Sequence, residues 1–189
     1  MNRIKAFLVI LIPSLILIII VTFGLIKDDK KSVGVNNNYA IGEIPKYFDG
    51  DLIMKSTIGE EVNLKNLNGK IVLIDFWSSW CAPCIAEAET LASTYNRWKD
   101  YDVEFIGVAI WDTQEDVDKF IKKYDVNYPI VIDDNGQIAV DFGVAAIPEK
   151  ILIDKNGKIV KKILGPSSSK DLNNIISEIS EDSLNLYKY

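Results

Sequence analysis

One stretch of this 189-residue chain, from residue 71 to residue 98, restricts the possible folds most. It opens with a β-branched apolar run, Ile71–Ile74, which Gly69 precedes and Phe76 and Trp77 extend. Such a run is typical of a buried strand. Apolar residues recur at helical spacing after Pro83, and proline is tolerated in a first helical turn. The stretch therefore predicts a strand over 71–77, a short turn and a helix over 82–98.

Cys81 and Cys84 fall where this helix should begin. Peptide dipoles and free N–H groups at a helix N-terminus favour a thiolate. A Cys-X-X-Cys pair in that position is expected to have an exposed, activated thiol at Cys81, with Cys84 within disulfide reach. The spacing therefore predicts a redox-active pair, with Cys81 attacking and Cys84 resolving.

Metal-binding and purely structural roles fit the two cysteines less well. A structural zinc site needs four ligands, and the chain has no His and no further Cys. A structural disulfide would close so short a loop that it would add little stability. Buried, inert thiols would not be expected in Trp-Cys-Ala-Pro-Cys at a strand-to-helix junction. No Pro-x-x-x-Thr/Ser-x-x-Cys pattern of a peroxidase is present either.

Composition limits the function further. The formal charge is −6, and the first 31 residues carry +3, which leaves −9 for the remainder. Such an acidic domain is a poor candidate for binding nucleic acid. The absence of His excludes a His general base, a His-ligated haem and His-containing metal sites. We therefore expect no cofactor other than the Cys81–Cys84 disulfide, and no metal.

The amino-terminal region predicts a membrane anchor over residues 1–26. Ala6 to Ile26 is almost entirely apolar and long enough to span a bilayer. A cleaved signal peptide is the alternative, although its apolar region is usually shorter. Lysine and arginine counts on the two sides of the span are nearly equal, so charge gives the orientation only weakly. Residues 27–40, charged and then Gly- and Asn-rich, predict a flexible linker.

One globular domain is expected over 41–182, with a frayed tail over 183–189. Its order of elements predicts a mixed sheet with helices on both faces, an α/β fold. The further elements expected are a hairpin from Asp51–Ile58 and Glu61–Leu64, a helical turn over 64–67, a strand Val103–Ile110, a helix capped by Thr113, a strand Tyr128–Ile132, a short helix Ile138–Phe142, a hairpin from Lys150–Asp154 and Lys158–Leu164, and a last helix over 168–179.

The segment Ile74–Cys84 resembles a thioredoxin-fold active site. Together with the apolar amino terminus, it is similar to the membrane-anchored TlpA/ResA/DsbE group of thiol–disulfide oxidoreductases. That resemblance implies a thioredoxin-like fold, with the strand and helix around 128–142 as the insertion of this group. It also implies a single-pass protein of the cytoplasmic membrane, with its redox domain on the outer, periplasmic side, and a link to cytochrome c maturation.

Two acidic residues near the cysteines are candidate catalytic groups. Asp75 interrupts an apolar strand, at the position of the buried thioredoxin Asp that exchanges a proton with the resolving cysteine. The alternative is a strand-end Asp that reaches water. Glu87 lies one helical turn after Cys84 and matches the acidic residue of TlpA-like proteins, or else is a solvated helix residue beside Glu89. With no His available, these carboxylates are the nearby proton acceptors.

Substrate contacts are expected from Trp80, Ile147 and Pro148. Ala146-Ile147-Pro148-Glu149 resembles the cis-proline loop of thioredoxin-fold enzymes, in which Ile147 would pair with an extended client backbone. An ordinary trans proline at a strand start is the alternative. Lys150-Ile151 departs from the Thr-Phe that family members often carry there, which affects client recognition. Trp77 is expected in the core, and packing is the default expectation for Trp111.

Three functions follow from these features. The first is a membrane-tethered enzyme that reduces disulfides in client proteins such as apocytochrome c, with electrons from a membrane thiol donor. The second is a disulfide-forming oxidant, since direction depends on the reduction potential and the upstream partner. The third is a non-catalytic thioredoxin-like binding or chaperone module.

Overall fold

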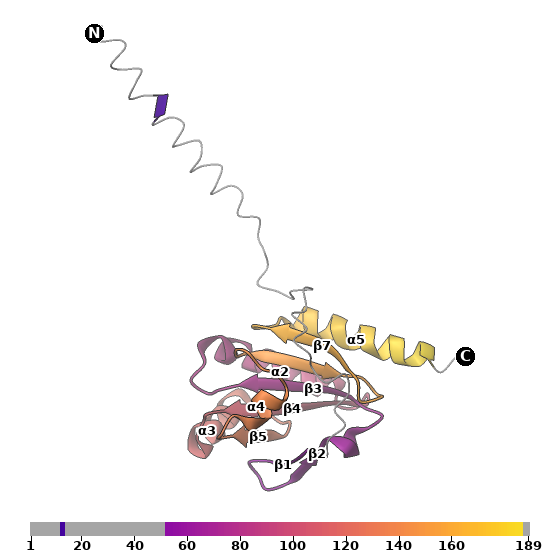
Figure 1. Ribbon diagram of the computed structural model, residues 1–189, viewed down its shortest axis with the longest axis horizontal. Helices are drawn as coiled ribbons and strands as arrows, with labels where there is room; N and C mark the ends of the chain where they lie inside the picture. Colours follow the sequence, from indigo (N-terminus) through magenta and orange to yellow (C-terminus); the bar gives the residue numbers. More distant parts are fainter. Residues whose placement is uncertain (1–11, 14–51, 187–189) are drawn as a thin grey trace. The chain divides into compact units, whose positions relative to one another are not determined.

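The computed structural model describes residues 12–13 and 52–186, and the fold is built from the second range (Figure 1). Its five-stranded sheet has the order β5-β4-β3-β6-β7. The central strand β3 pairs parallel with β4 and antiparallel with β6. The expected mixed sheet is therefore confirmed. The strands are β3 (Ile71–Trp77), β4 (Val103–Ile110), β5 (Ile130–Asp133), β6 (Glu149–Ile153) and β7 (Ile159–Leu164).

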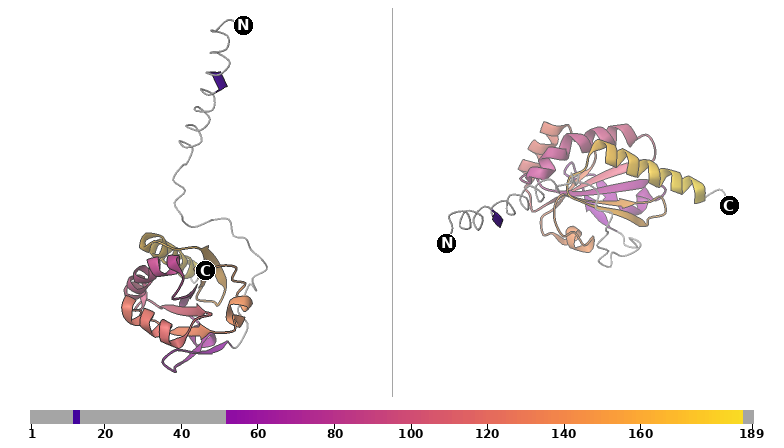
Figure 2. Two further views of the ribbon diagram at one scale, coloured as in Figure 1. Left: turned by 90° about the vertical axis from the view of Figure 1, so that its left-hand side faces the viewer. Right: turned by 90° about the horizontal axis from the view of Figure 1, so that it is seen from above.

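Strand β3 separates two apolar layers because its side chains alternate between the faces of the sheet. Ile71, Leu73 and Trp77 pack under the helices α2 (Ala82–Trp98), α3 (Gln114–Tyr124) and α5 (Ser169–Leu186). Val72, Ile74 and Phe76 face the other layer, which includes α4 (Gln137–Asp141) and the hairpin β1 (Ile53–Lys55) and β2 (Glu61–Asn63). The right-hand view of Figure 2 shows the three long helices on one side of the sheet and α4 on the other. Burial on both faces explains why β3 is an unbroken apolar run apart from Asp75.

Most predicted elements are confirmed, four of them (β3, α2, β4 and the turn over 64–67) with their expected bounds. The amino-terminal hairpin, the 3-10 turn η1 (Leu64–Leu67) and the inserted β5 and α4 are also present. The hairpin strands are shorter than expected, and β5 begins at Ile130 instead of Tyr128. Pro129 precedes Ile130 and has no N–H for a ladder, which is consistent with the later start.

The last helix differs from the expectation at both ends. Ser168 lies before α5 and caps it, since its Oγ accepts a hydrogen bond from Asp171 N at 3.2 Å. The helix then continues to Leu186, well past residue 179. No Gly or Pro follows Ile179 to stop it. The expected tail over 183–189 is therefore helical as far as residue 186.

The expected anchor over 1–26 and linker over 27–40 lie outside the described residues, apart from Ile12 and Pro13. Within the part of the chain that the structure describes, no helix is both long enough and apolar enough to cross a bilayer. Residues 52–186 belong to a single compact unit, and the site lies within it.

Gly107 in β4 makes room for the side chains above it. A Cβ at this position would lie 2.4 Å from Ile130 Cδ1 and 2.9 Å from Trp77 Nε1. Trp77 itself is buried, as expected, and its ring packs on Phe120 with centroids 4.2 Å apart. The glycine directly beside Asp75 in the sheet thus lets Trp77 and Ile130 approach the backbone of β4.

Candidate active site

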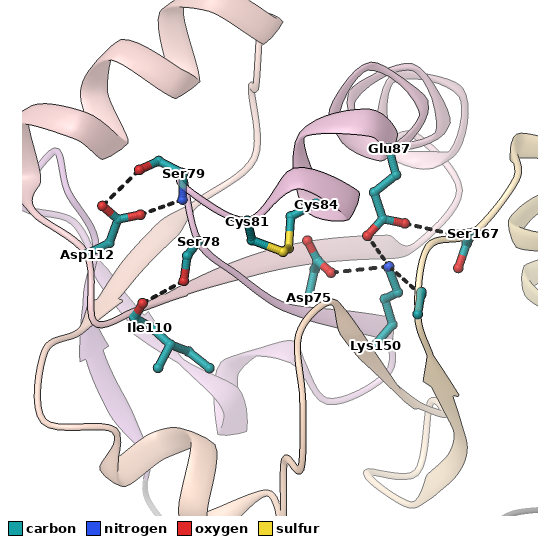
Figure 3. Close-up of a disulfide and its surroundings, with 11 residues drawn as sticks. Asp75, Ser78, Ser79, Cys81, Cys84, Glu87, Ile110, Asp112, Lys150 and Ser167 are labelled. Atoms are coloured by element: carbon teal, nitrogen blue, oxygen red, sulfur yellow. Dashed lines mark hydrogen bonds and ion pairs between the residues drawn. A yellow bond between two sulfur atoms is a disulfide. The ribbon is translucent and has the colours of Figure 1, made fainter.

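The two cysteines lie where β3 passes into α2. Cys81 is the N-cap of α2, with φ −83° and ψ 109°, and Pro83 occupies the first helical turn. Cys84 lies in that turn, and its side chain belongs to the buried face of the helix. The two sulfur atoms form a disulfide across a Cα–Cα distance of 5.3 Å (Figure 3). The predicted placement of the pair is therefore confirmed.

The exposure of Cys81 is lower than the sequence predicted. In the disulfide form Cys81 is 6% exposed and Cys84 is 2% exposed. The Cys81 sulfur is bonded to that of Cys84, which lies on the buried face of α2. Cys81 is the slightly more accessible of the two.

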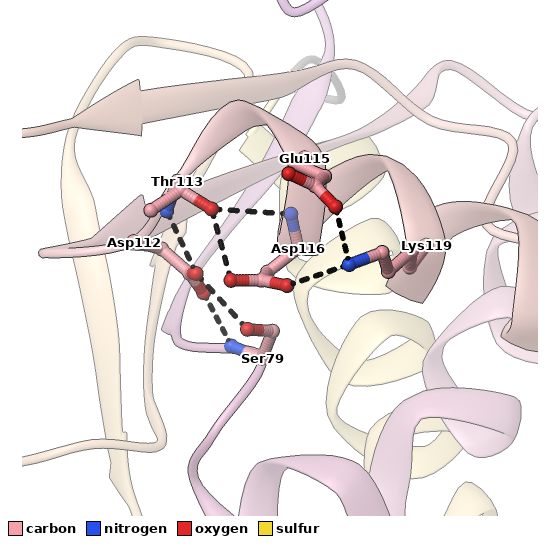
Figure 4. Close-up of polar contacts among 6 residues, drawn as sticks. All are labelled: Ser79, Asp112, Thr113, Glu115, Asp116 and Lys119. Atoms are coloured by element: carbon pink, nitrogen blue, oxygen red, sulfur yellow. Dashed lines mark hydrogen bonds and ion pairs between the residues drawn. The ribbon is translucent and has the colours of Figure 1, made fainter.

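The turn before Cys81 is held to the end of the neighbouring strand. Ser78 Oγ donates a hydrogen bond of 2.6 Å to the carbonyl oxygen of Ile110. Asp112 accepts two hydrogen bonds from Ser79, from N at 2.5 Å and from Oγ at 2.9 Å (Figure 4). Its Oδ1 also accepts from the backbone N–H of Thr113, the cap of α3. These bonds fix the path of the chain into the first turn of α2.

Asp75 is a buried carboxyl group beneath the first turns of α2. It is 3% exposed, so the alternative of a strand-end Asp that reaches water is wrong. Asp75 lies on the same face of β3 as Leu73 and Trp77, which pack in the same layer as both cysteines. In the view of Figure 3 its carboxylate lies between the disulfide and the Lys150 ammonium group. The nearest oxygen, Oδ1, is 3.7 Å from Lys150 Nζ.

Glu87 is also buried, at 3% exposure, so the alternative of a solvated helix residue is wrong as well. Oε1 accepts a hydrogen bond from Lys150 Nζ, and Oε2 accepts one of 2.7 Å from the backbone N–H of Ser167. Lys150 Nζ donates a further bond of 3.1 Å to the carbonyl oxygen of Gly165. Two carboxylates and one fully buried lysine therefore share one polar cluster next to the cysteines (Figure 3).

Burial sets the protonation of this cluster. It raises the pKa of Asp75 to about 7, a rise that Lys150 opposes and Glu87 reinforces. Burial also raises the pKa of Glu87, while Lys150 and the Ser167 N–H act in the opposite direction. Asp75 is therefore able to gain or lose a proton near neutral pH.

The loop before β6 has the predicted cis peptide bond, between Ile147 and Pro148. Ile147 is half-buried and packs against the apolar cluster that contains both cysteines. The buried Glu149 Oε2 accepts a hydrogen bond of 3.3 Å from Ala145 N, and its Oε1 pairs with Lys162 Nζ at 2.5 Å. The loop that carries Ile147 and Pro148 is thus held by an ion pair between the buried Glu149 and the half-buried Lys162.

Two tryptophans lie exposed beside the turn. Trp80 is 60% exposed, as expected for a residue that lines the surface, and its Nε1 donates to the Trp111 carbonyl oxygen at 3.4 Å. Packing is the default expectation for Trp111, and the structure leaves this residue 68% exposed. Its φ of 48° turns the chain at the end of β4. Its indole lies over Gly136, where a Cβ would come within 3.1 Å of Nε1.

Lys150 and Asp112 are not among the residues that the sequence predicts for the site. Lys150 breaks an apolar strand, which is the same signal that singles out Asp75. Asp112 directly follows β4, and the carboxyl ends of the parallel strands β3 and β4 meet at one edge of the sheet. Neither sequence pattern shows which distant residue Lys150 or Asp112 contacts.

No group of His, Cys, Asp or Glu side chains in the described ranges is arranged to hold a metal ion. The site instead places a disulfide at a helix N-terminus, close to a buried acid. A thioredoxin-like fold with this arrangement defines the class of thiol–disulfide oxidoreductases.

Comparison with known proteins agrees with this class. The model of the AhpC/TSA family matches residues 49–162. "Thiol-disulfide oxidoreductase ResA" of Bacillus thuringiensis subsp. konkukian is 32% identical over 154 residues, 82% of each chain. A putative thiol:disulfide interchange protein DsbE from Chlorobium tepidum gives a TM-score of 0.63 at 26% identity, over 69% of this chain and 93% of that one. StoA from Bacillus subtilis gives a TM-score of 0.58 at 29% sequence identity, and the match covers 65% of this chain and 93% of that one.

The chain belongs to the AhpC/TSA family, and its relatives within that family are thiol–disulfide oxidoreductases of the ResA and DsbE type.

Proposed function

We propose that this protein is a membrane-tethered reductase of disulfides in client proteins, with Cys81 as the attacking and Cys84 as the resolving thiol. The observation that carries the proposal is the Cys81–Cys84 disulfide at the N-terminus of α2, above a buried acid. The helix N-terminus stabilises the Cys81 thiolate, and the lower exposure of Cys84 reserves it for the second step.

The reaction proceeds through a mixed disulfide. The Cys81 thiolate attacks one sulfur of a client disulfide, and the other client sulfur leaves as a thiolate. The Cys84 thiol then gives its proton to the Asp75 carboxylate and attacks Cys81 Sγ. This closes the Cys81–Cys84 disulfide and releases the second client thiolate. Two electrons pass to the client, and a thiol donor in the membrane restores the reduced pair.

The client contacts proposed are Trp80, Ile147 and Pro148. Trp80 presents an exposed aromatic face beside Cys81. The backbone of Ile147 would pair with an extended client segment, and Pro148 removes an N–H near the sulfur atoms. No nucleic-acid partner is proposed, because the domain is acidic.

The apolar stretch from Ala6 to Ile26 supports a single-pass anchor with the redox domain outside the cytoplasmic membrane. A domain whose two cysteines are both used in catalysis suits that compartment. The resemblance to the TlpA/ResA/DsbE group supports apocytochrome c as a client.

The test is the trapping of client proteins on single-cysteine variants. Cys84→Ser should accumulate mixed disulfides through Cys81, because the resolving thiol is gone. Cys81→Ser is the matched control and should trap none and lose exchange. An active Cys81→Ser protein would overturn the proposal. A double Cys→Ser variant that still performs the cellular role of the protein would instead support a non-catalytic module.

A further inference from the structure

Lys150 lies at the centre of the buried polar cluster. It is fully buried in β6, and it stands directly across from Asp75 in the antiparallel pairing of β6 with β3. Cross-strand partners point to the same face of the sheet. Here that face is covered by α2, which supplies Glu87 three residues after Cys84. Lys150 Nζ therefore contacts carboxylates from two different elements.

The contacts of the two carboxylates are unequal. Both oxygens of Glu87 accept hydrogen bonds, one from Lys150 Nζ and one from Ser167 N. Oδ1 of Asp75 accepts none from the described residues and lies 3.7 Å from Nζ. Hydrogen bonds to a carboxylate favour its ionised form. Glu87 is thus the better placed of the two to stay ionised, and Asp75 is the one that exchanges a proton.

The net charge of the buried cluster also indicates that one of the two carboxylates binds a proton. With both carboxylates ionised, the buried cluster would carry a net charge of −1, and with one proton bound it is neutral. Burial disfavours the charged state. Tyr128, another titratable group against the cluster, is buried before β5, and its pKa is held well above its usual value by burial, Asp75 and Glu87. Tyr128 therefore stays neutral and takes no part in the proton balance of the two carboxylates.

We propose that Lys150 is a positioning residue that divides the roles of the two carboxylates, holding Glu87 ionised and keeping Asp75 able to accept the Cys84 proton near neutral pH. This inference rests on the proposed exchange reaction. Without the ammonium group, both carboxylates would be buried without a counter-charge, and Asp75 would remain protonated to higher pH. Without the charge on Glu87, Lys150 would act on Asp75 alone, and Asp75 would ionise at lower pH.

The experiment follows the reduced full-length chain reacting with 5,5′-dithiobis(2-nitrobenzoate) between pH 5 and 9. The first equivalent of aromatic thiolate reports attack by Cys81, and the second reports attack by Cys84 on the resulting mixed disulfide. The pH midpoint of the second phase should rise in Lys150→Met, by about 1–3 pH units, the usual effect of losing a nearby opposite charge. It should fall in Glu87→Gln.

Lys70→Met is the matched control. Lys70 pairs with Glu104 at 3.2 Å, at the end of β3 that is opposite the cysteines. Its removal should leave the midpoint of the second phase unchanged. Shifts of Lys150→Met and Glu87→Gln in the same direction would indicate general loosening and overturn the inference, as would an unshifted midpoint in Lys150→Met.

The double variant Glu87→Gln/Lys150→Met covers the case in which the single lysine variant does not fold, because it removes both partners of an ion pair at once. Its midpoint should lie above that of Glu87→Gln, and equality of the two would overturn the inference. A wild-type protein that releases no second equivalent at any pH would instead overturn the proposed exchange reaction, and this inference with it.

Discussion

Lys150 lies directly opposite Asp75 in the pairing of β6 with β3, and its Nζ is 3.7 Å from Asp75 Oδ1. The strand that leads into the cysteines and the strand that follows the cis-proline loop thus each place one charged side chain beneath α2. Asp75 is ready for proton exchange because burial raises its pKa to about 7. The stability of the protein should therefore depend on the protonation of Asp75.

Asp75→Asn should make the oxidised protein more stable at pH 8 and leave it little changed near pH 4. The carboxyl group has a pKa of about 7 when folded and 3.8 otherwise, so the folded state binds more protons between these pH values. The contribution of Asp75 to the free energy of unfolding therefore falls as pH rises from about 4 to about 7, and is flat above that range. The variant should remove this fall, which is on the order of 4 kcal/mol.

Urea denaturation of the disulfide form at several pH values measures this effect. Asp100→Asn serves as the control, because Asp100 is an exposed acid. It should follow the wild-type pH dependence. If the free energy of unfolding depends on pH in the same way in Asp75→Asn and the wild type, Asp75 does not titrate in this range.

Asp112→Ala should loosen the turn that precedes Cys81. The change removes the acceptor of three hydrogen bonds, two from Ser79 and one from Thr113 (Figure 4). The expected loss of stability is about 1–3 kcal/mol, since the Ser79 N–H is left without its acceptor. Exchange by Cys81 should slow as well, because its position on α2 is less well fixed.

Asp116→Ala is the paired variant. Asp116 accepts a hydrogen bond from Thr113 Oγ and pairs with Lys119, but it makes no contact with Ser79 (Figure 4). Its loss should change stability little, as for other exposed pairs, and leave exchange unchanged. Equal exchange rates in the two variants would contradict the role given to Asp112.

Trp80→Ala should weaken client binding with little effect on stability. The side chain is 60% exposed beside Cys81, so truncation removes client contact area but little core packing. With insulin as a model substrate, KM should rise about tenfold while kcat changes less. Tyr101→Ala is the control, because Tyr101 is similarly exposed but follows the far end of α2. An unchanged KM in Trp80→Ala would remove Trp80 from the substrate contacts.

Sequence patterns locate the framework of the site because local signals determine it. The apolar run of β3, Pro83 and the helical repeat of α2 each lie within a few residues of the cysteines, so strand, turn and helix could be predicted with their bounds. The Thr113 cap of α3 was predictable for the same reason, since its partner Asp116 is three residues away.

The contacts that tune the site could not be predicted in the same way. Glu87 and Lys150 are 63 residues apart, and Ser167 is 80 residues from Glu87. Their meeting depends on strand register and on the packing of α2 over the sheet, which no local pattern gives. From the sequence, Lys150 is only a departure from the family pattern. The exposure of Trp111 could not be predicted either, because it follows from a left-handed turn at the end of β4.

The equilibrium reduction potential of the Cys81/Cys84 pair, measured in the full-length chain against glutathione buffers, tests the proposed reductase directly. A reductant of client disulfides should give a value at or below about −230 mV, toward that of thioredoxin. A value above about −160 mV, toward that of DsbA, would make the protein a disulfide-forming oxidant. A pair that forms no disulfide with any oxidant would contradict the whole account and favour a non-catalytic binding module.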